Sequence, residues 1–289
     1  MEQQRGISIA LMGIDGSGKT SLLTHLGRAF DDAGLEWVNV GRKSVIRQAA
    51  DTGGYPGASL ERLWLEAWRL LFGGGHRSGS PVDAVIPLQF EGMTTDRFIE
   101  LLPDSVAGVR RSGPVSTMWT EYAIDQIVRA EAVEPALRRG AIALSDGFGY
   151  KSAAKVLRIA RELPDPAIPD ETLDRFSDLI RTAYGDAYLQ PDIGILLDAD
   201  PERSYEWRRG LGRLGPAEDL WLAGRTGRAA FVDLQSAVAQ DLVDAAKAWG
   251  WHVLRVDGRP QRTTAEEAMD IVLRHRRVRE RVGDRRKET

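Results

Sequence analysis

The sequence contains no cysteine, and its apolar runs are short. Without cysteine, the chain can form neither a disulfide framework nor a cysteine-ligated metal site. No run approaches the roughly 20 apolar residues that a helix needs to cross a bilayer, so we expect no membrane partner. The first residues, Met1-Glu2-Gln3-Gln4-Arg5, lack the apolar core of a signal peptide. These absences predict a cytoplasmic protein.

Basic charge is not in excess either, because 39 Lys and Arg face 42 Asp and Glu, for a net charge of −3. A surface that binds nucleic-acid phosphates usually makes its whole domain basic, so we expect no nucleic-acid partner. A content of 43% hydrophobic and 28% charged residues is typical of a soluble globular protein. Nothing resembles a disordered linker, so we predict a single domain over residues 1–289.

The most informative stretch is Gly13-Ile14-Asp15-Gly16-Ser17-Gly18-Lys19-Thr20, which matches G-x-x-x-x-G-K-[ST] in full. An apolar run precedes it and apolar residues at helical spacing follow it, as a phosphate-binding loop requires. Glycines let backbone N–H groups curl around phosphate oxygens. Lys19 can then reach the β- and γ-phosphates, and the Thr20 hydroxyl can ligate Mg²⁺. The predicted cofactors are ATP and Mg²⁺, and the predicted ATP-binding residues are Gly13, Asp15, Gly16, Ser17, Gly18, Lys19 and Thr20.

Short apolar strands alternate with helical patterns along the rest of the chain. Strands are expected at 7–12, 35–40, 141–145, 191–198 and 252–256. This alternation predicts an α/β fold of the P-loop NTPase type, with a five-stranded parallel sheet and helices on both faces. Between 73 and 118, glycine and proline repeatedly break any period. We interpret that segment as an insertion of loops and short helices, one of them near 95–102.

Charged residues follow two of the expected strands. Asp146 ends the strand at 141–145, where a second Mg²⁺-organising acid is expected beside Thr20. The strand at 35–40 ends in Gly41-Arg42-Lys43-Ser44. Ligands of open α/β folds bind at the carboxyl ends of strands, so Arg42 and Lys43 are candidate anion contacts.

Two further stretches carry a resemblance to a known family. They are Glu134-Pro135-Ala136-Leu137-Arg138-Arg139-Gly140 and Pro191-Asp192-Ile193-Gly194-Ile195-Leu196-Leu197-Asp198-Ala199-Asp200-Pro201-Glu202. Together with the phosphate loop and its internal acid, they make the chain resemble the thymidylate kinases among the nucleoside monophosphate kinases. The resemblance implies a five-stranded core, ATP as phosphoryl donor, Mg²⁺, a lid after the fourth strand and a homodimer.

The departures from this family concern the acceptor. Where the family pattern has Asp-Arg-aromatic, this chain has Asp146-Gly147-Phe148, and Ile124 stands where a second arginine is expected. Losing two guanidinium contacts to a dianion weakens monophosphate binding, so dTMP is not the expected acceptor. A nucleoside, a modified nucleotide or another hydroxyl-bearing small molecule fits better. The candidate acceptor-binding residues are Arg42, Lys43, Gln126, Phe148 and Tyr150.

The resemblance also implies catalytic roles. The arginine-rich stretch at 208–228 follows the fourth strand, where the family has its lid, and an arginine there can neutralise charge on the transferred phosphoryl group. The family's acid at the place of Asp15 contacts a sugar hydroxyl, so Asp15 is a candidate for orienting an attacking hydroxyl or taking its proton. The candidate catalytic residues are Lys19, Asp15, Arg208, Arg209 and Arg213.

Two other classes remain open from the sequence. A nucleotide-binding regulatory or switch protein would need no small-molecule acceptor, and Asp146-Gly147-Phe148-Gly149 matches the short D-x-x-G pattern of GTPases. The guanine-reading [NT]-K-x-D element is absent from the chain. A non-catalytic family member acting through dimerisation is the other alternative, and the presence of Lys19, Thr20 and Asp146 argues against it.

Overall fold

We describe a computed structural model of the protein. The residues described are 5–50, 54–77, 79–82, 86–90, 97–98, 102, 106–211, 214–215, 217–256 and 258–280. In these residues strands and helices alternate along the chain. The α-helices are α1 (Lys19–Asp32), α2 (Arg42–Ala50), α3 (Gly57–Leu71), α5 (Ser112–Val128), α6 (Glu134–Arg138), α7 (Tyr150–Glu162), α8 (Asp170–Tyr184), α9 (Pro201–Gly210), α10 (Gly227–Trp249) and α11 (Gln261–Arg274).

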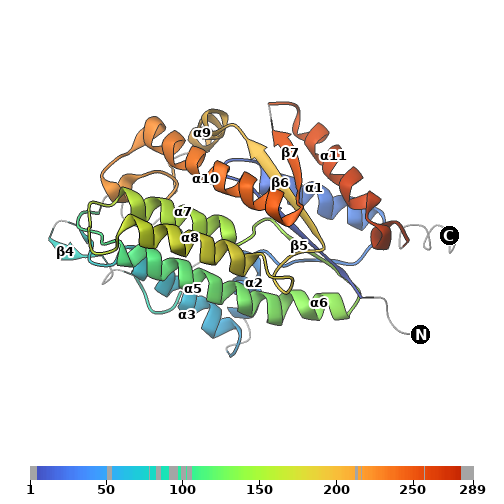
Figure 1. Ribbon diagram of the computed structural model, residues 1–289. Coiled ribbons are helices and arrows are strands. Elements are labelled where there is room, and N and C mark those ends of the chain that lie inside the picture. The colour runs from blue at the N-terminus through green and yellow to red at the C-terminus, as the bar shows by residue number, and fades with distance from the viewer. Residues whose placement is uncertain are drawn as a thin grey trace.

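Five parallel strands form the central sheet: β1 (Ile7–Met12), β2 (Trp37–Asn39), β5 (Ile142–Ser145), β6 (Ile193–Ala199) and β7 (His252–Val256). Their order across the sheet is β2-β5-β1-β6-β7 (Figure 1). β1 lies in the middle, because Ile9 is in register with Leu144 of β5 on one side and with Ile193 of β6 on the other. The predicted α/β class and five-stranded parallel sheet are confirmed.

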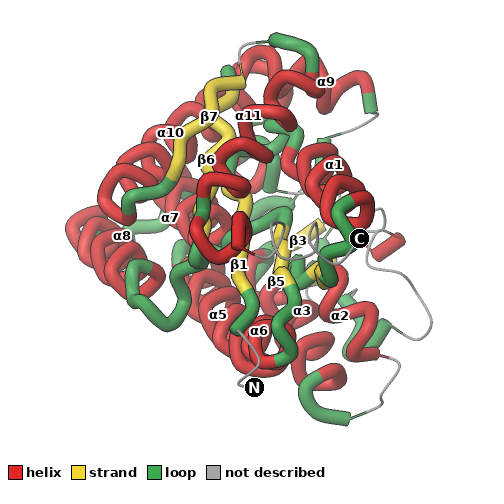
Figure 2. The backbone as a smooth tube through the Cα atoms, turned by 90° about the vertical axis from the view of Figure 1, so that its right-hand side faces the viewer, coloured by secondary structure: helices red, strands yellow, loops and turns green. Residues whose placement is uncertain are grey.

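The side chains of β1 alternate between two hydrophobic cores, one on each face of the sheet. Ile7, Ile9 and Leu11 belong to a core with residues of α1 and α11. Ala10 and Met12 belong to a larger core with residues of α3, α5, α7, α8 and α10. Successive side chains of a strand point to opposite faces of the sheet, so β1 contributes to both cores. Helices therefore cover both faces of the sheet, as Figures 1 and 2 show.

Helix boundaries differ from expectation in two places that matter for the site. Arg42 and Lys43 lie in the first turn of α2, a helix that is not among those expected from the sequence. Residues 227–249 form α10, a helix that the sequence reading does not name. Its buried residues Phe231, Leu234 and Val238 recur at helical spacing, so the period is present in the sequence.

The predicted insertion at 73–118 is shorter than expected, because its last seven residues are the first two turns of α5. Its described part contains a small antiparallel pair, β3 (His76–Arg77) and β4 (Ser80–Pro81). The helix predicted near 95–102 lies mostly outside the described residues. Phe90 and Phe98 pack against Trp64 of α3, with ring centroids 5.4 Å away in both cases.

The helix predicted from 119 to 139 is three segments, α5, a π-helical turn η2 (Arg129–Val133) and α6. Gly140 follows with φ of 82° and ends the run, as predicted. Another single turn, the 3₁₀ helix η3 (Trp221–Ala223), precedes α10. None of the helices in the described part of the chain is long and apolar enough to span a membrane.

Candidate active site

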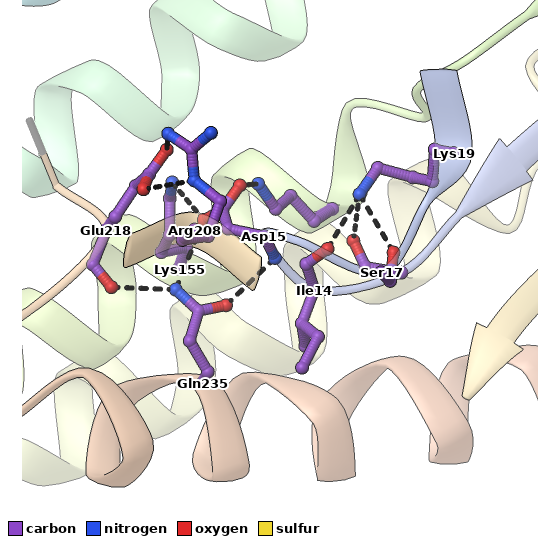
Figure 3. Close-up of polar contacts among 10 residues, drawn as sticks. Ile14, Asp15, Ser17, Lys19, Lys155, Arg208, Glu218 and Gln235 are labelled. Carbon is purple, nitrogen blue, oxygen red and sulfur yellow. Dashed lines mark hydrogen bonds and ion pairs between the residues drawn. The ribbon is translucent and has the colours of Figure 1, made fainter. Parts of the chain in front are cut away.

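The phosphate-binding loop joins the end of β1 to the start of α1. Gly16 and Gly18 have φ angles of 80° and 90°, which residues with a Cβ rarely adopt. A Cβ on Gly16 would lie 2.7 Å from the Ser204 carbonyl oxygen, so glycine also lets α9 approach the loop. Lys19 folds over the loop and donates to the carbonyl oxygens of Gly13 at 2.9 Å and Ile14 at 2.7 Å. It also donates to the Ser17 hydroxyl at 3.2 Å, and Figure 3 shows its bonds to Ile14 and Ser17.

Thr20 and Asp146 meet across the carboxyl edge of the sheet. The Thr20 hydroxyl donates to Oδ2 of Asp146 at 3.0 Å. Hydroxyl and carboxylate oxygens are the hard ligands that Mg²⁺ prefers, and proteins usually hold this ion with one or two such groups while substrate phosphates supply others. The two predicted metal ligands, 126 residues apart, therefore form a donor set that fits Mg²⁺.

Asp15 at the tip of the loop is surrounded by cations. Lys155 donates to its Oδ2 at 3.0 Å, and Lys151 forms an ion pair with its Oδ1. Both lysines come from α7, one turn apart. Gln235 of α10 donates to Oδ2 of Asp15 at 3.1 Å and accepts the Asp15 backbone N–H at 3.1 Å. Both carboxylate oxygens are thus engaged (Figure 3).

The pKa values in this cluster are strongly perturbed. Burial alone would raise the pKa of Asp15, but the ammonium groups of Lys151, Lys155 and Lys19 outweigh it and hold that pKa well below its usual value. Burial is the main cause that lowers the pKa of Lys151 to about 7, although Asp15 opposes it. An acid with a lowered pKa is a poor proton acceptor, so these contacts give the hypothesis of Asp15 as a base no support.

The arginines predicted as lid residues separate into two groups. Arg208, near the end of α9, lines the cavity described below and pairs with Glu218 through two hydrogen bonds of 2.8 and 2.5 Å. Arg209 is exposed and pairs with Glu206. Arg225 pairs with Glu162 and Asp233, and Arg228 with Glu202. Arg213 lies outside the described residues. Of the described arginines of the predicted lid, Arg208 alone lines the cavity.

A cavity of about 1200 Å³ runs from the phosphate loop to α3 and α5. At its far end Arg42 forms ion pairs with Glu121, and with Asp125 at 2.7 Å. Tyr184 donates to Asp125 as well, at 2.5 Å. The apolar wall at this end is formed by residues of α3, α5 and α7: Trp64, Ala67, Trp68, Leu71, Val128 and Val156.

The other predicted acceptor residues differ in position. Lys43 and Phe148 line the cavity together with Arg42. Gln126 and Tyr150 are not among its lining residues. Tyr150 is buried and packs against Trp249, with ring centroids 4.9 Å apart. Gln126 lies one position from Asp125, so on a helix its side chain points about 100° away from that residue.

Sequence reasoning missed four polar residues of the site: Glu121, Asp125, Lys155 and Gln235. Glu121 and Asp125 are spaced i, i+4 on α5, and Lys151 and Lys155 are spaced likewise on α7, which puts each pair on one helix face. Gln235 is a fully buried polar residue within the apolar stripe of α10. A polar residue in such a stripe is the signal that could have found it.

Comparisons with known proteins give little further information. No family model matches the chain, and no curated protein matches it. Among solved structures, it is similar to deoxyadenosine kinase from M. mycoides with bound dCTP, at a TM-score of 0.44 and 11% identity, over 92% of this chain and 98% of that chain. This similarity is too remote to assign a substrate or a residue role to this chain.

Proposed function

We propose that the protein is an ATP-dependent phosphotransferase of the P-loop type. It transfers the γ-phosphoryl group of ATP to a nucleotide or nucleoside-like small molecule other than dTMP. The observation that carries this proposal is the meeting of three features at one sheet edge. They are the phosphate-binding loop with Lys19, the Thr20–Asp146 oxygen pair, and the cavity that continues from them to α5.

The phosphate end of the cavity supports a nucleoside triphosphate donor. The loop glycines and the N-terminus of α1 provide backbone N–H groups and a partial positive charge for phosphate oxygens. Lys19, Lys151, Lys155 and Arg208 all line this end. Thr20 and Asp146 would hold Mg²⁺, which, when bound, neutralises charge on the phosphate oxygens.

The size of the cavity supports a second substrate. Pockets for one small ligand usually measure about 300–1,000 Å³, and this cavity reaches about 1200 Å³. A donor on the loop therefore leaves room for an acceptor beside α3 and α5. In the transfer, an acceptor oxygen bonds to the γ-phosphorus while the bond to the β,γ-bridging oxygen breaks. ADP leaves, and the proton of an attacking hydroxyl passes to solvent.

The acceptor end supports recognition of a largely neutral group. Arg42 is a basic residue of this end, but Glu121 and Asp125 already balance its charge. Its guanidinium is less available to a phosphate dianion than an unpaired one would be. Trp64, Trp68 and Phe148 offer apolar aromatic surface, and nucleobases stack on such rings. A nucleoside kinase is therefore the second form of the proposal, with Glu121 and Asp125 as hydroxyl acceptors.

The test is a panel of nucleosides and nucleoside monophosphates incubated with γ-labelled ATP. Transfer of label to one of them, at an oxygen identified by mass spectrometry, supports the proposal. Label that appears only as inorganic phosphate, with every member of the panel, contradicts it and favours a nucleotide-binding regulatory protein. Lys19→Ala is the control, because it should remove both transfer to an acceptor and release of inorganic phosphate if either depends on the phosphate-binding loop.

Three finer expectations stay predictions. Membership of the thymidylate kinases would require activity on a nucleoside monophosphate in the same panel. The homodimer would be detected by light scattering on the purified protein. The cytoplasmic location would be checked by fractionation of expressing cells.

A further inference from the structure

Two lysines of α7, Lys151 and Lys155, have N–H donors that no side chain among the described residues accepts. An ammonium group has three N–H donors. Within the described part of the chain, Lys151 and Lys155 each donate to the Asp15 carboxylate and to no other side chain. The two side chains are only 15% and 12% exposed. Since both residues line the cavity, their remaining donors lie at its wall.

The charge around these donors is positive. Asp15 is one carboxylate among three ammonium groups, those of Lys19, Lys151 and Lys155. Of the other two acids nearby, Glu218 is balanced by its ion pair with Arg208. Asp146 accepts a hydrogen bond from the neutral Thr20 hydroxyl, and its charge is the one proposed above to hold Mg²⁺. Buried charge without a counterion is costly. The cluster is therefore suited to an anion that brings more negative charge than Asp15 alone.

We infer that Lys151 and Lys155 form, together with Lys19, a binding site for the terminal phosphoryl group of the nucleotide. This inference rests on the proposed function, and it names the cations that hold the group being transferred. Asp15 acts as a positioning residue, because it holds both lysines against the phosphate-binding loop.

The position of the lysines in the fold supports this role. α7 follows directly from Asp146 at the end of β5, so its first turns lie at the same sheet edge as the oxygen pair of Thr20 and Asp146. Gly147, the residue after Asp146, has no side chain to offer a phosphate. Lys151 and Lys155 bring positive charge to that edge from the first and second turns of the helix.

The opposing explanation is that the lysines only support the loop through Asp15. The two explanations differ in which ligand is affected. Support of the loop stabilises every nucleotide, since ADP and ATP share the α- and β-phosphates. Contact with the terminal phosphoryl group stabilises ATP but not ADP.

The experiment measures Kd for Mg·ATP and for Mg·ADP by titration calorimetry, in wild type, Lys151→Met and Lys155→Met. We expect Kd for ATP to rise at least about tenfold in each variant, as for a lost hydrogen bond to a charged group, with Kd for ADP changing less than about threefold. Lys247→Met is the matched control, an exposed lysine on α10, and should change neither value. Equal changes for ATP and ADP, or no change, overturn the inference.

A charge-balanced variant keeps the test valid if a single lysine substitution unfolds the protein. Asp15→Asn combined with Lys151→Met removes one charge of each sign, so the buried cluster keeps its net charge. If the double variant binds ATP more weakly than Asp15→Asn does, with ADP affinity unchanged, contact of Lys151 with the terminal phosphoryl group is supported. If the two variants show no such ATP-selective difference, the inference is overturned. Failure of the proposed function is distinguishable: wild type would then bind ATP selectively and yet label no acceptor.

Discussion

Gln235 binds both the backbone and the side chain of Asp15: its Oε1 accepts the Asp15 backbone N–H, and its Nε2 donates to the Asp15 carboxylate, each at 3.1 Å. The same Nε2 also donates to the Glu218 carbonyl oxygen at 2.9 Å, as Figure 3 shows. Glu218 in turn pairs with Arg208. The fully buried side-chain amide of Gln235 thus connects the phosphate-binding loop to Glu218, the ion-pair partner of Arg208.

Gln235→Leu should therefore destabilise the protein and weaken nucleotide binding. The substitution leaves the Asp15 N–H and the Glu218 carbonyl without their partner, which costs about 1–3 kcal/mol for buried groups. Thermal or urea unfolding measures the loss. Gln240→Leu on the exposed side of the same helix is the control and should stay within about 0.5 kcal/mol. Equal stability of the two variants would contradict a role for the buried amide.

Lys19→Ala should abolish most phosphoryl transfer. Removing a group that stabilises charge on the reacting phosphate typically costs about 10²- to 10³-fold in kcat. The measurement is transfer of label from ATP to the acceptor found in the panel, with Lys247→Ala as the control. A Lys19→Ala enzyme with wild-type turnover would falsify the assignment of the loop as the donor site.

Thr20→Val and Asp146→Asn should raise the Mg²⁺ concentration needed for half-maximal activity, by about 10- to 100-fold, as changes around metal sites commonly do. Thr24→Val is the matched control, because Thr24 lies one turn further along α1 and its hydroxyl bonds to the Thr20 carbonyl oxygen. Titration of Mg²⁺ at fixed ATP gives the answer. An unchanged Mg²⁺ requirement in both variants would remove these two residues from the metal site.

Arg42→Met should lower the free energy of unfolding by about 3–5 kcal/mol, because it leaves the carboxylates of Glu121 and Asp125 buried without their cation. The Arg42 side chain is 17% exposed, and its two partners are 10% and 16% exposed. Arg181→Met is the comparison, since Arg181 pairs with Asp178 on an open helix face, and such pairs are worth about 0–1 kcal/mol. Similar losses in the two variants would mean that the Arg42 cluster carries no special stability.

Nucleotide binding above pH 7 should take up a proton. Burial lowers the pKa of Lys151 to about 7, among Asp15, Lys155 and Lys19, so at pH 8 much of this lysine is neutral in the free protein. A bound phosphate anion favours the charged form and raises that pKa. Calorimetry in two buffers of different ionisation enthalpy measures the uptake, which Lys151→Met should remove. ATP affinity should fall as the pH rises from 7 to 9.

The same pKa has a consequence for stability without nucleotide. Between about pH 7 and the ordinary lysine value of 10.5, the unfolded chain binds more protons at position 151 than the folded chain does. The contribution of this group to the free energy of unfolding therefore rises with pH over that window. Comparing wild type with Lys151→Met at pH 7 and pH 9 isolates this contribution, and an identical pH slope in the two proteins would contradict it.

The sequence by itself determined the sheet and the phosphate-binding loop. Both depend on short-range chemistry, because apolar runs predict buried strands and glycines permit left-handed backbone near Lys19. It also indicated that Asp146 ends a strand beside Thr20, since parallel strands bring their carboxyl ends to one edge.

Tertiary structure alone decided which charges meet. Asp15 contacts Lys151, Lys155 and Gln235, which lie 136, 140 and 220 residues further along the chain. Arg42 likewise pairs with Glu121 and Asp125 of α5. Tyr150 is buried in the core and does not line the cavity. Such contacts depend on how α5, α7 and α10 pack against one face of the sheet. Local periodicity tells which face of a helix is buried, but not which residue of another helix it will face.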